Sequence, residues 1–151
     1  MPQEIERKFL VHKELWDQVQ SESSKLVHQL YLHADKSKAI RVRIIGDKGV
    51  ITIKSKVSDI KRLEFEYEIP LEDAQLMMKT YQDCPQIEKT RHFISLDKHV
   101  WEVDVFHGKN EGLIVAEIEL SQEDEEFSKP NWIAEEVSDD DQYLNVNLAN
   151  K

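Results

Sequence analysis

The sequence predicts a mainly β protein of the α+β class, whose strands form a closed barrel or a strongly curled antiparallel sheet. Eight segments alternate apolar and polar residues with a period of two, which is typical of strands that bury one face. The helical segments are few and short, and no Gly-, Ser- or Pro-rich stretch indicates a linker. Closure into a barrel is favoured because it removes the exposed edge strands of an open sheet.

The predicted elements follow one another along the whole chain. The first strand covers 3–11, and a short helix at 13–20 places Leu15, Trp16 and Val19 at helical spacing. A second helix is predicted at 71–81, directly after Pro70, and the tail 132–151 is expected to end in a third, after the cap-like run 138–141. The other strands are predicted at 28–34, 39–45, 50–57, 63–69, 87–96, 100–107 and 113–120.

Length and composition restrict the class of protein. The 151 residues indicate a single domain, 1–151, with a core large enough to need no disulfide or structural zinc. The net charge of −10 opposes a nucleic-acid-coating surface or a face for anionic membranes. No run of about 18 apolar residues is present, and the charged N-terminal segment lacks the apolar region of a signal peptide. We therefore expect a cytoplasmic protein with neither membrane nor nucleic-acid partners.

The charged side chains of the predicted strands share single faces. Residues two apart on a strand point the same way, so each of the sets below lies on one face. An ordinary amphipathic sheet, with its charged face in water, explains any one of these strands. Acidic and basic pairs occupy largely separate strands, however, which favours a polyanion held by cations and clustered carboxylates that hold metal ions. The sets are Glu4, Glu6 and Lys8; Arg41 and Arg43; Thr52, Lys54 and Lys56; Arg62, Glu64 and Glu66; Lys89 and Arg91; and Glu117 and Glu119.

Paired glutamates of this kind are hard oxygen ligands, which suit Mg²⁺ or Mn²⁺ rather than a thiolate-bound metal. If the charged faces line the inside of a barrel, the apolar faces outside must be covered by the helices and the tail. We expect the covering residues to include Leu15, Trp16, Met77, Trp132 and Leu148.

The sequence resembles the CYTH superfamily, the triphosphate tunnel metalloenzymes, over nearly its whole length. The run Glu4-Ile5-Glu6-Arg7-Lys8 fits the ExExK signature of that family. Further matching stretches follow in order: Arg41-Val42-Arg43, Thr52-Ile53-Lys54, Arg62 to Glu66, Lys89-Thr90-Arg91, Trp101 to Phe106, and Gly112 to Leu120. Such an ordered set is far more specific than the ExExK run alone.

The resemblance implies an eight-stranded antiparallel β-barrel tunnel, with flanking helices and a C-terminal helix, that binds a triphosphate and a divalent metal. By this likeness, Glu6, Lys89 and Tyr31 are the catalytic candidates, although Tyr31 is at least as well explained as a packing aromatic. Asp104 is placed near the tunnel rim as a partner of the site. The implied substrate-binding residues are Lys8, Arg41, Arg43, Lys54, Arg62, Lys89 and Arg91, and the implied metal ligands are Glu4, Glu6, Glu64, Glu66, Glu117 and Glu119.

The leading function is hydrolysis of inorganic tripolyphosphate with Mg²⁺ or Mn²⁺ as cofactor. A thiamine triphosphatase and a class IV adenylate cyclase would share the same site and stay open as alternatives. A non-catalytic polyphosphate- or nucleotide-binding module is disfavoured, because six inward carboxylates repel an anionic ligand unless metal is present. A homodimer is compatible with the sequence, but no surface patch in it identifies an interface.

Overall fold

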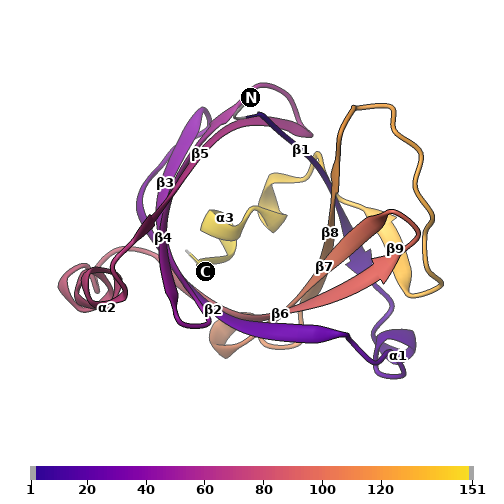
Figure 1. Ribbon diagram of the computed structural model, residues 1–151, viewed down its shortest axis with the longest axis horizontal. Helices are drawn as coiled ribbons and strands as arrows, with labels where there is room; N and C mark the ends of the chain where they lie inside the picture. Colours follow the sequence, from indigo (N-terminus) through magenta and orange to yellow (C-terminus); the bar gives the residue numbers. More distant parts are fainter. Residues whose placement is uncertain (1–2, 150–151) are drawn as a thin grey trace.

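The computed structural model, which describes residues 3–149 except the side chain of residue 146, is a closed eight-stranded antiparallel barrel (Figure 1). Neighbouring strands around the barrel follow the order β5-β4-β3-β2-β6-β7-β8-β1, and pairing of β1 with β5 closes the ring. The strands are β1 (Gln3–Val11), β2 (Ser23–Ala34), β3 (Lys38–Ile45), β4 (Lys48–Lys56), β5 (Lys61–Ile69), β6 (Gln86–Leu96), β7 (His99–Phe106) and β8 (Ile114–Leu120). The predicted fold class is confirmed.

Tight turns connect several neighbouring strands and fix their register. Ile45 lies opposite Lys48, so β3 and β4 are joined by the two residues Gly46 and Asp47. Gly46 has φ +60°, a left-handed conformation that a side chain disfavours, which explains glycine at this position. At the other end of this turn, a Cβ on Gly49 would lie 2.9 Å from the Cβ of Ala74. The glycine therefore allows α2 (Leu71–Thr80) to pack closely on the barrel.

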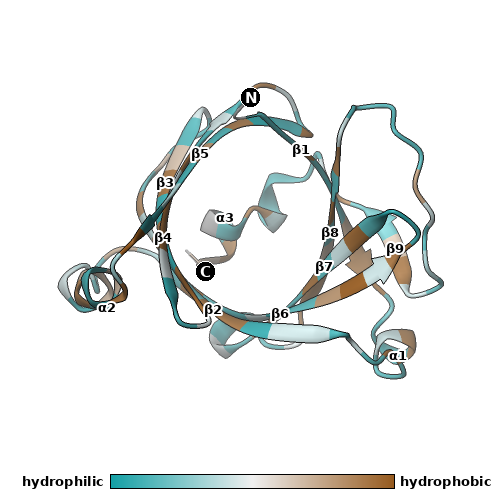
Figure 2. Ribbon diagram, viewed as in Figure 1, coloured by the Kyte–Doolittle hydropathy of each residue, from teal (hydrophilic) through white to brown (hydrophobic). Residues whose placement is uncertain are grey.

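Two hydrophobic clusters cover parts of the outer barrel surface. One lies against β1, β7 and β8, where Phe9 and Trp101 pack beneath α1 (Lys13–Trp16), the segment 121–132 and β9 (Ile133–Glu136). The ring centroids of Trp101 and Trp132 are 5.9 Å apart, edge to face. The other cluster joins Ala74 and Met78 of α2 to the outward side chains of β2 to β4. Figure 2 shows hydrophobic residues along the strands and on the elements outside the ring, α1, α2 and β9. Trp16, Trp132 and Met77 thus cover the outer face, as the sequence predicts.

The C-terminal segment takes a different path from the predicted one. After η2 (Asp141–Tyr143), the short helix α3 (Asn145–Ala149) lies within the ring of strands (Figure 1). Leu148 packs with Tyr31, Phe106 and Val115, whose side chains face the barrel interior. The expectation that Leu148 covers an outer face is therefore wrong. Alternation along the strands indicates which strand residues share a face, but it does not specify which tail residue enters the barrel interior.

Several element boundaries also differ from the prediction. The first helix has a single turn, 13–16, rather than 13–20, and β2 begins five residues earlier than expected, at Ser23. β9 was not predicted, because four residues in a polar tail carry little periodic signal; it pairs with β1 through Phe9 and Val11. η1 (Gly108–Asn110) lies in the turn between β7 and β8. In the part of the chain that is described, no helix is long and apolar enough to cross a membrane.

Candidate active site in the barrel interior

Carboxylates line one side of the barrel interior. Alternation along β1 turns Glu4, Glu6 and Lys8 inward, and Ile5 and Phe9 outward into the covered core. In the register of β1 with β8, Glu6 lies opposite Glu119 and Lys8 lies opposite Glu117. Two neighbouring strands therefore direct four glutamates into one region.

Cations line the other side of the interior. Arg41 and Arg43 on β3 are only 8% and 5% exposed, and Lys89 on β6 is fully buried. Lys54 projects inward from β4, and Arg91 from β6. Burial of so many cations is unfavourable unless negative charge compensates it. The carboxylates of the protein supply only part of this negative charge.

Asp104 of β7 joins the acidic and basic sides. Its carboxylate oxygens accept hydrogen bonds from Arg91 at 2.8 and 2.9 Å, and Lys89 Nζ lies 2.8 Å from Oδ2. Asp104 is 1% exposed, so the expectation that it lies near the tunnel rim is wrong. The register places it directly opposite Arg91, well inside the barrel. Glu102 lies two residues before Asp104 on the same face of β7. Its carboxylate is 2.9 Å from Arg91, and its side chain is more exposed than that of Asp104.

A second set of ion pairs lies where β1, β4 and β5 meet. Lys54 Nζ is 2.8 Å from Glu4 and 3.3 Å from Glu64. Arg43 lies 3.1 Å from Glu66, whose side chain is 43% exposed and is therefore at the edge of the interior. Arg62 donates to the backbone carbonyl of Ser58 at 2.6 Å, within its own hairpin.

The titration behaviour of the acidic side reflects burial and the proximity of other carboxylates. Burial and, next, the Glu117 carboxylate raise the pKa of Glu6 to about 8. Burial also raises the pKa values of Glu4 and Glu119. Burial opposes ionisation of Glu117 too, but Lys8 and Arg91 outweigh it and lower its pKa well below the usual value. The raised pKa values on this side thus come chiefly from burial, and neighbouring carboxylates add to the effect.

On the basic side, burial shifts pKa values in the opposite direction. Burial lowers the pKa of Lys89 to about 8, and burial with the neighbouring Arg41 lowers the pKa of Arg43 to about 10. Within residues 3–149, the Nε atoms of Arg41 and Arg43 are buried without a hydrogen-bond acceptor, whereas Lys89 Nζ lies 2.8 Å from Asp104. Donors buried without acceptors are costly in an interior, so their arrangement fits a bound anion.

Tyr31 lies beside these donors. Its hydroxyl accepts a hydrogen bond of 3.0 Å from Gln29 Nε2, and the register sets Tyr31 opposite Arg41. Burial raises the pKa of the Tyr31 hydroxyl, so this group stays protonated near neutral pH. It can therefore donate a proton or a hydrogen bond to an anion held by Arg41.

The donor atoms on the acidic side fit a divalent cation in their chemistry. The oxygens are carboxylates, which Mg²⁺ and Mn²⁺ prefer, and burial with neighbouring carboxylates raises the pKa values of Glu6 and Glu119. Glu4 and Glu64 are drawn toward Lys54, and Glu66 toward Arg43. Across the described residues, no three His, Cys, Asp or Glu side chains converge closely enough to hold a metal ion. The ligand types fit, but several of these side chains face cations of the protein.

A cavity of about 450 Å³ lies between the inward-facing side chains of the barrel and the C-terminal segment. Glu6, Lys8, Arg41, Lys54 and Arg62 line it together with Tyr31. The tail supplies the opposite wall through residues between 137 and 147, and Lys8 Nζ donates to the carbonyl oxygen of Tyr143 at 3.0 Å. Sequence reasoning missed this contribution, because a backbone carbonyl leaves no trace in residue type.

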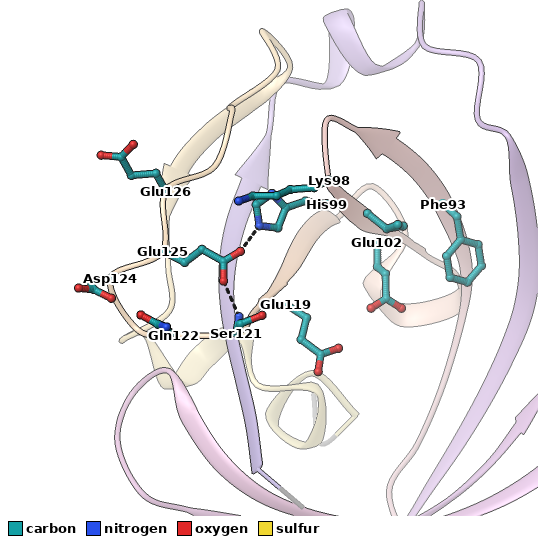
Figure 3. Close-up of a pocket in the computed structure, with 11 residues that line it drawn as sticks. Phe93, Lys98, His99, Glu102, Glu119, Ser121, Gln122, Asp124, Glu125 and Glu126 are labelled. Atoms are coloured by element: carbon teal, nitrogen blue, oxygen red, sulfur yellow. Dashed lines mark hydrogen bonds and ion pairs between the residues drawn. The ribbon is translucent and has the colours of Figure 1, made fainter. Parts of the chain in front are cut away.

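A second depression, of about 1010 Å³, lies toward the end of the barrel away from this tail (Figure 3). Phe93, Glu102 and Glu119 line it from the strands, and the loop after β8 adds further acidic residues, including Glu125. Glu125 is paired with His99 and accepts a hydrogen bond from the backbone N–H of Ser121. The interior thus ends in an acidic mouth on this side.

Comparisons with known proteins agree with this geometry. A family model described as "CYTH domain" matches residues 2–151. The inorganic triphosphatase of Acetivibrio thermocellus is 44% identical, with 99% of this chain and 94% of that protein aligned. The inorganic triphosphatase of Nitrosomonas europaea is 32% identical, over 97% and 96% of the two chains. A crystal structure of an inorganic triphosphatase superposes with a TM-score of 0.67 at 30% identity, covering 98% of this chain and 95% of the other.

Proposed function

Because this chain belongs to the CYTH domain family, we propose that it is a divalent-metal-dependent triphosphatase, acting as a single domain over 1–151. The substrate is inorganic tripolyphosphate, which is hydrolysed to pyrophosphate and phosphate. The observation that carries the proposal is the barrel interior, where buried arginine donors without acceptors face clustered carboxylates. Two similar proteins that carry the name inorganic triphosphatase support it.

The basic side binds the triphosphate. Arg41 and Arg43 present fixed guanidinium forks, which suit phosphate oxygens better than an ammonium does. Lys8 reaches the same cavity from β1 and exchanges the Tyr143 carbonyl for a phosphate oxygen. The complete set that we propose for substrate binding is Lys8, Arg41, Arg43, Lys54, Arg62, Lys89 and Arg91.

The acidic side binds Mg²⁺ or Mn²⁺, and the ligands we assign are Glu4, Glu6, Glu64, Glu66, Glu117 and Glu119. When bound, the cation neutralises charge on the phosphate and lowers the pKa of a coordinated water. The glutamates of β1 and β8 supply this function most directly, because they lie opposite one another in the register. Glu64 and Glu66 must leave Lys54 and Arg43 to contribute, and the arriving phosphate offers those cations a new partner.

Three residues act in the chemical step. Glu6 orients the attacking water and accepts its proton, a task suited to a carboxylate whose pKa is raised toward neutrality. Lys89 stabilises the charge on the terminal phosphoryl oxygens. The water oxygen bonds to the terminal phosphorus while the bridging P–O bond breaks, and Tyr31 donates a hydrogen bond to the leaving pyrophosphate oxygen.

The lining of the 450 Å³ cavity favours a bare phosphate chain. Of the described residues that line it, Tyr31 is the sole aromatic one, and its hydroxyl is bonded to Gln29. A nucleoside or thiamine group would find no stacking platform beside it. We expect tripolyphosphate to exceed ATP at least about ten-fold in kcat/KM, because the nucleoside adds little transition-state binding. We also place this activity in the cytoplasm, where the free thiol of Cys84 remains reduced.

One assay tests the function. The purified protein is given tripolyphosphate, ATP and thiamine triphosphate at equal, subsaturating concentrations with Mg²⁺ or Mn²⁺, and the products are separated by ion chromatography. The expected result is pyrophosphate and phosphate from tripolyphosphate. Formation of cyclic AMP, or faster consumption of thiamine triphosphate, would replace the proposal with a cyclase or a thiamine triphosphatase. Absence of turnover, with the ligand still bound, would indicate a binding module.

A further inference from the structure

The outer face of β5 is an exposed apolar strip without a covering element among the described residues. Leu63, Phe65 and Tyr67 point outward and are 39%, 40% and 60% exposed, and Ile53 of the adjacent β4 is 37% exposed. The charged residues of β5 between them, Glu64, Glu66 and Glu68, take the other face. We call these four apolar residues the β5 strip.

The rest of the barrel surface explains why this strip is unusual. α2 packs on β3 and β4, and the cluster with Trp16 and Trp132 covers β1, β7 and β8. Neither covers Leu63, Phe65 or Tyr67, although α2 packs against Ile69 at the end of β5. A chain with a net charge of −10 has many acidic residues with which to coat its surface, and yet four neighbouring large apolar side chains remain here. Contiguous apolar patches of this kind mark interaction surfaces.

The charges at the two ends of the strip identify the partner. Lys61 lies at its first end, on the same outward face, and Glu72 and Asp73 of α2 follow β5 at its other end. A two-fold axis through the centre of the strip would place a second copy antiparallel to the first. Lys61 of each copy then meets Glu72 and Asp73 of the other, while the apolar side chains pack between them.

We propose that two copies of this chain form a homodimer through the β5 strip, face to face. Stable interfaces bury about 800 Å² on each partner, with an apolar centre and a polar rim. The strip supplies the centre, and the hairpin at Lys61 and the start of α2 supply the rim.

Edge-to-edge pairing of two β5 strands does not replace this arrangement. Within residues 3–149, β1 pairs with β5 only through Lys61 to Leu63, so the later part of that β5 edge has no strand partner. Antiparallel pairing along this edge would bring Glu66 and Glu68 of one copy against the same residues of the other. Like charges directly opposed across strands are destabilising, so the face is favoured over the edge.

Sedimentation equilibrium of the full-length protein at micromolar concentrations tests the proposal. The expected species has twice the 17.8 kDa of one chain. Phe65→Glu and, separately, Tyr67→Lys should each shift the protein to monomer with an unchanged far-UV circular dichroism spectrum. Leu26→Glu is the matched control, because Leu26 is 60% exposed on β2, which β3 and β4 separate from β5, and the variant should remain dimeric.

Charge exchange then tests the orientation. Lys61→Glu should weaken the dimer at least about ten-fold, and combining it with Glu72→Lys and Asp73→Lys should restore it. A monomeric wild-type protein would overturn the proposal, as would a dimer that survives both strip variants. A dimer disrupted only by Leu26→Glu would place the interface on β2 and also contradict it. Failure of the triple variant to recover would exclude the antiparallel arrangement.

Discussion

The acidic and basic sides of the barrel interior differ in how their charge is compensated. Burial raises the pKa values of Glu4, Glu6 and Glu119, and the neighbouring cations do not offset this rise. Across the barrel, Arg41 and Arg43 keep buried donors without acceptors in the described part of the chain. Asp104, which binds both Lys89 and Arg91, joins the two sides. The barrel interior therefore has an acidic side suited to a cation and a basic side suited to an anion.

The largest expected effect is on the acidic half. Chelation by EDTA should abolish tripolyphosphate hydrolysis, and added Mg²⁺ or Mn²⁺ should restore it, because the glutamates otherwise repel the substrate. A coupled phosphate-release assay with and without chelator measures this. Undiminished turnover in EDTA would show that the carboxylates do not serve a cation.

Glu6→Gln should lower kcat by about 100-fold or more. The substitution removes a cation ligand and proton acceptor while keeping the shape of the side chain. Steady-state kinetics compared with the exposed control Glu72→Gln, at equal thermal stability, separates catalysis from folding. Retention of wild-type kcat by a folded Glu6→Gln protein would remove Glu6 from the site.

At the boundary between the halves, Asp104→Asn should lower the free energy of unfolding by about 3–5 kcal/mol, because it leaves Lys89 and Arg91 buried without their anionic partner. Urea denaturation measures the loss. Glu102→Gln is the control, since its carboxylate is 31% exposed and its pair with Arg91 contributes less. Equal effects of the two variants would argue against a special role for Asp104.

The smallest expected effect concerns substrate affinity on the basic half. Arg41→Ala should weaken tripolyphosphate binding by about 1.5–3 kcal/mol, the contribution of one charge-assisted contact. Calorimetry with Ca²⁺ and a non-hydrolysable analogue measures it, and Lys79→Ala on exposed α2 provides the control. Unchanged affinity in Arg41→Ala would mean that the phosphate binds elsewhere in the barrel.

Period-two alternation in the sequence predicted a barrel or strongly curled sheet whose charged residues share single faces, and the resemblance to the CYTH superfamily implied that these faces line a closed tunnel. The faces of β1, β3 and β8 follow directly from Glu4 and Glu6, Arg41 and Arg43, and Glu117, because side-chain direction depends only on local strand geometry. The resemblance to the CYTH superfamily then indicated the chemistry. Its assignment of individual ligands and catalytic residues stays a prediction, which the variants above address.

Properties that depend on tertiary structure could not be predicted in this way. The depth of Asp104 depends on its register opposite Arg91, which alternation does not specify. Leu148 is equally apolar whether it covers an outer face or fills the interior, so its sequence context does not distinguish the two positions. The exposed β5 strip has the same pattern as the covered strands, and only the placement of α2 shows that it is bare.

The pH dependence of stability tests the central claim most directly, which is that the acidic half is built for a cation. In EDTA, the folded protein holds the Glu6 proton up to a pKa of about 8, whereas the unfolded chain releases it near 4.5. Stability should therefore fall as pH rises from about 4.5 to 8, by on the order of a few kcal/mol.

Urea denaturation of the wild type and Glu6→Gln at pH 5.5 and pH 8, in EDTA and in Mg²⁺, measures this dependence. We predict that Glu6→Gln is the more stable protein at pH 8 in EDTA, and that Mg²⁺ reverses the order by binding the wild type more tightly. A wild type that is more stable than Glu6→Gln at pH 8 in EDTA, with no response to Mg²⁺, would contradict the account.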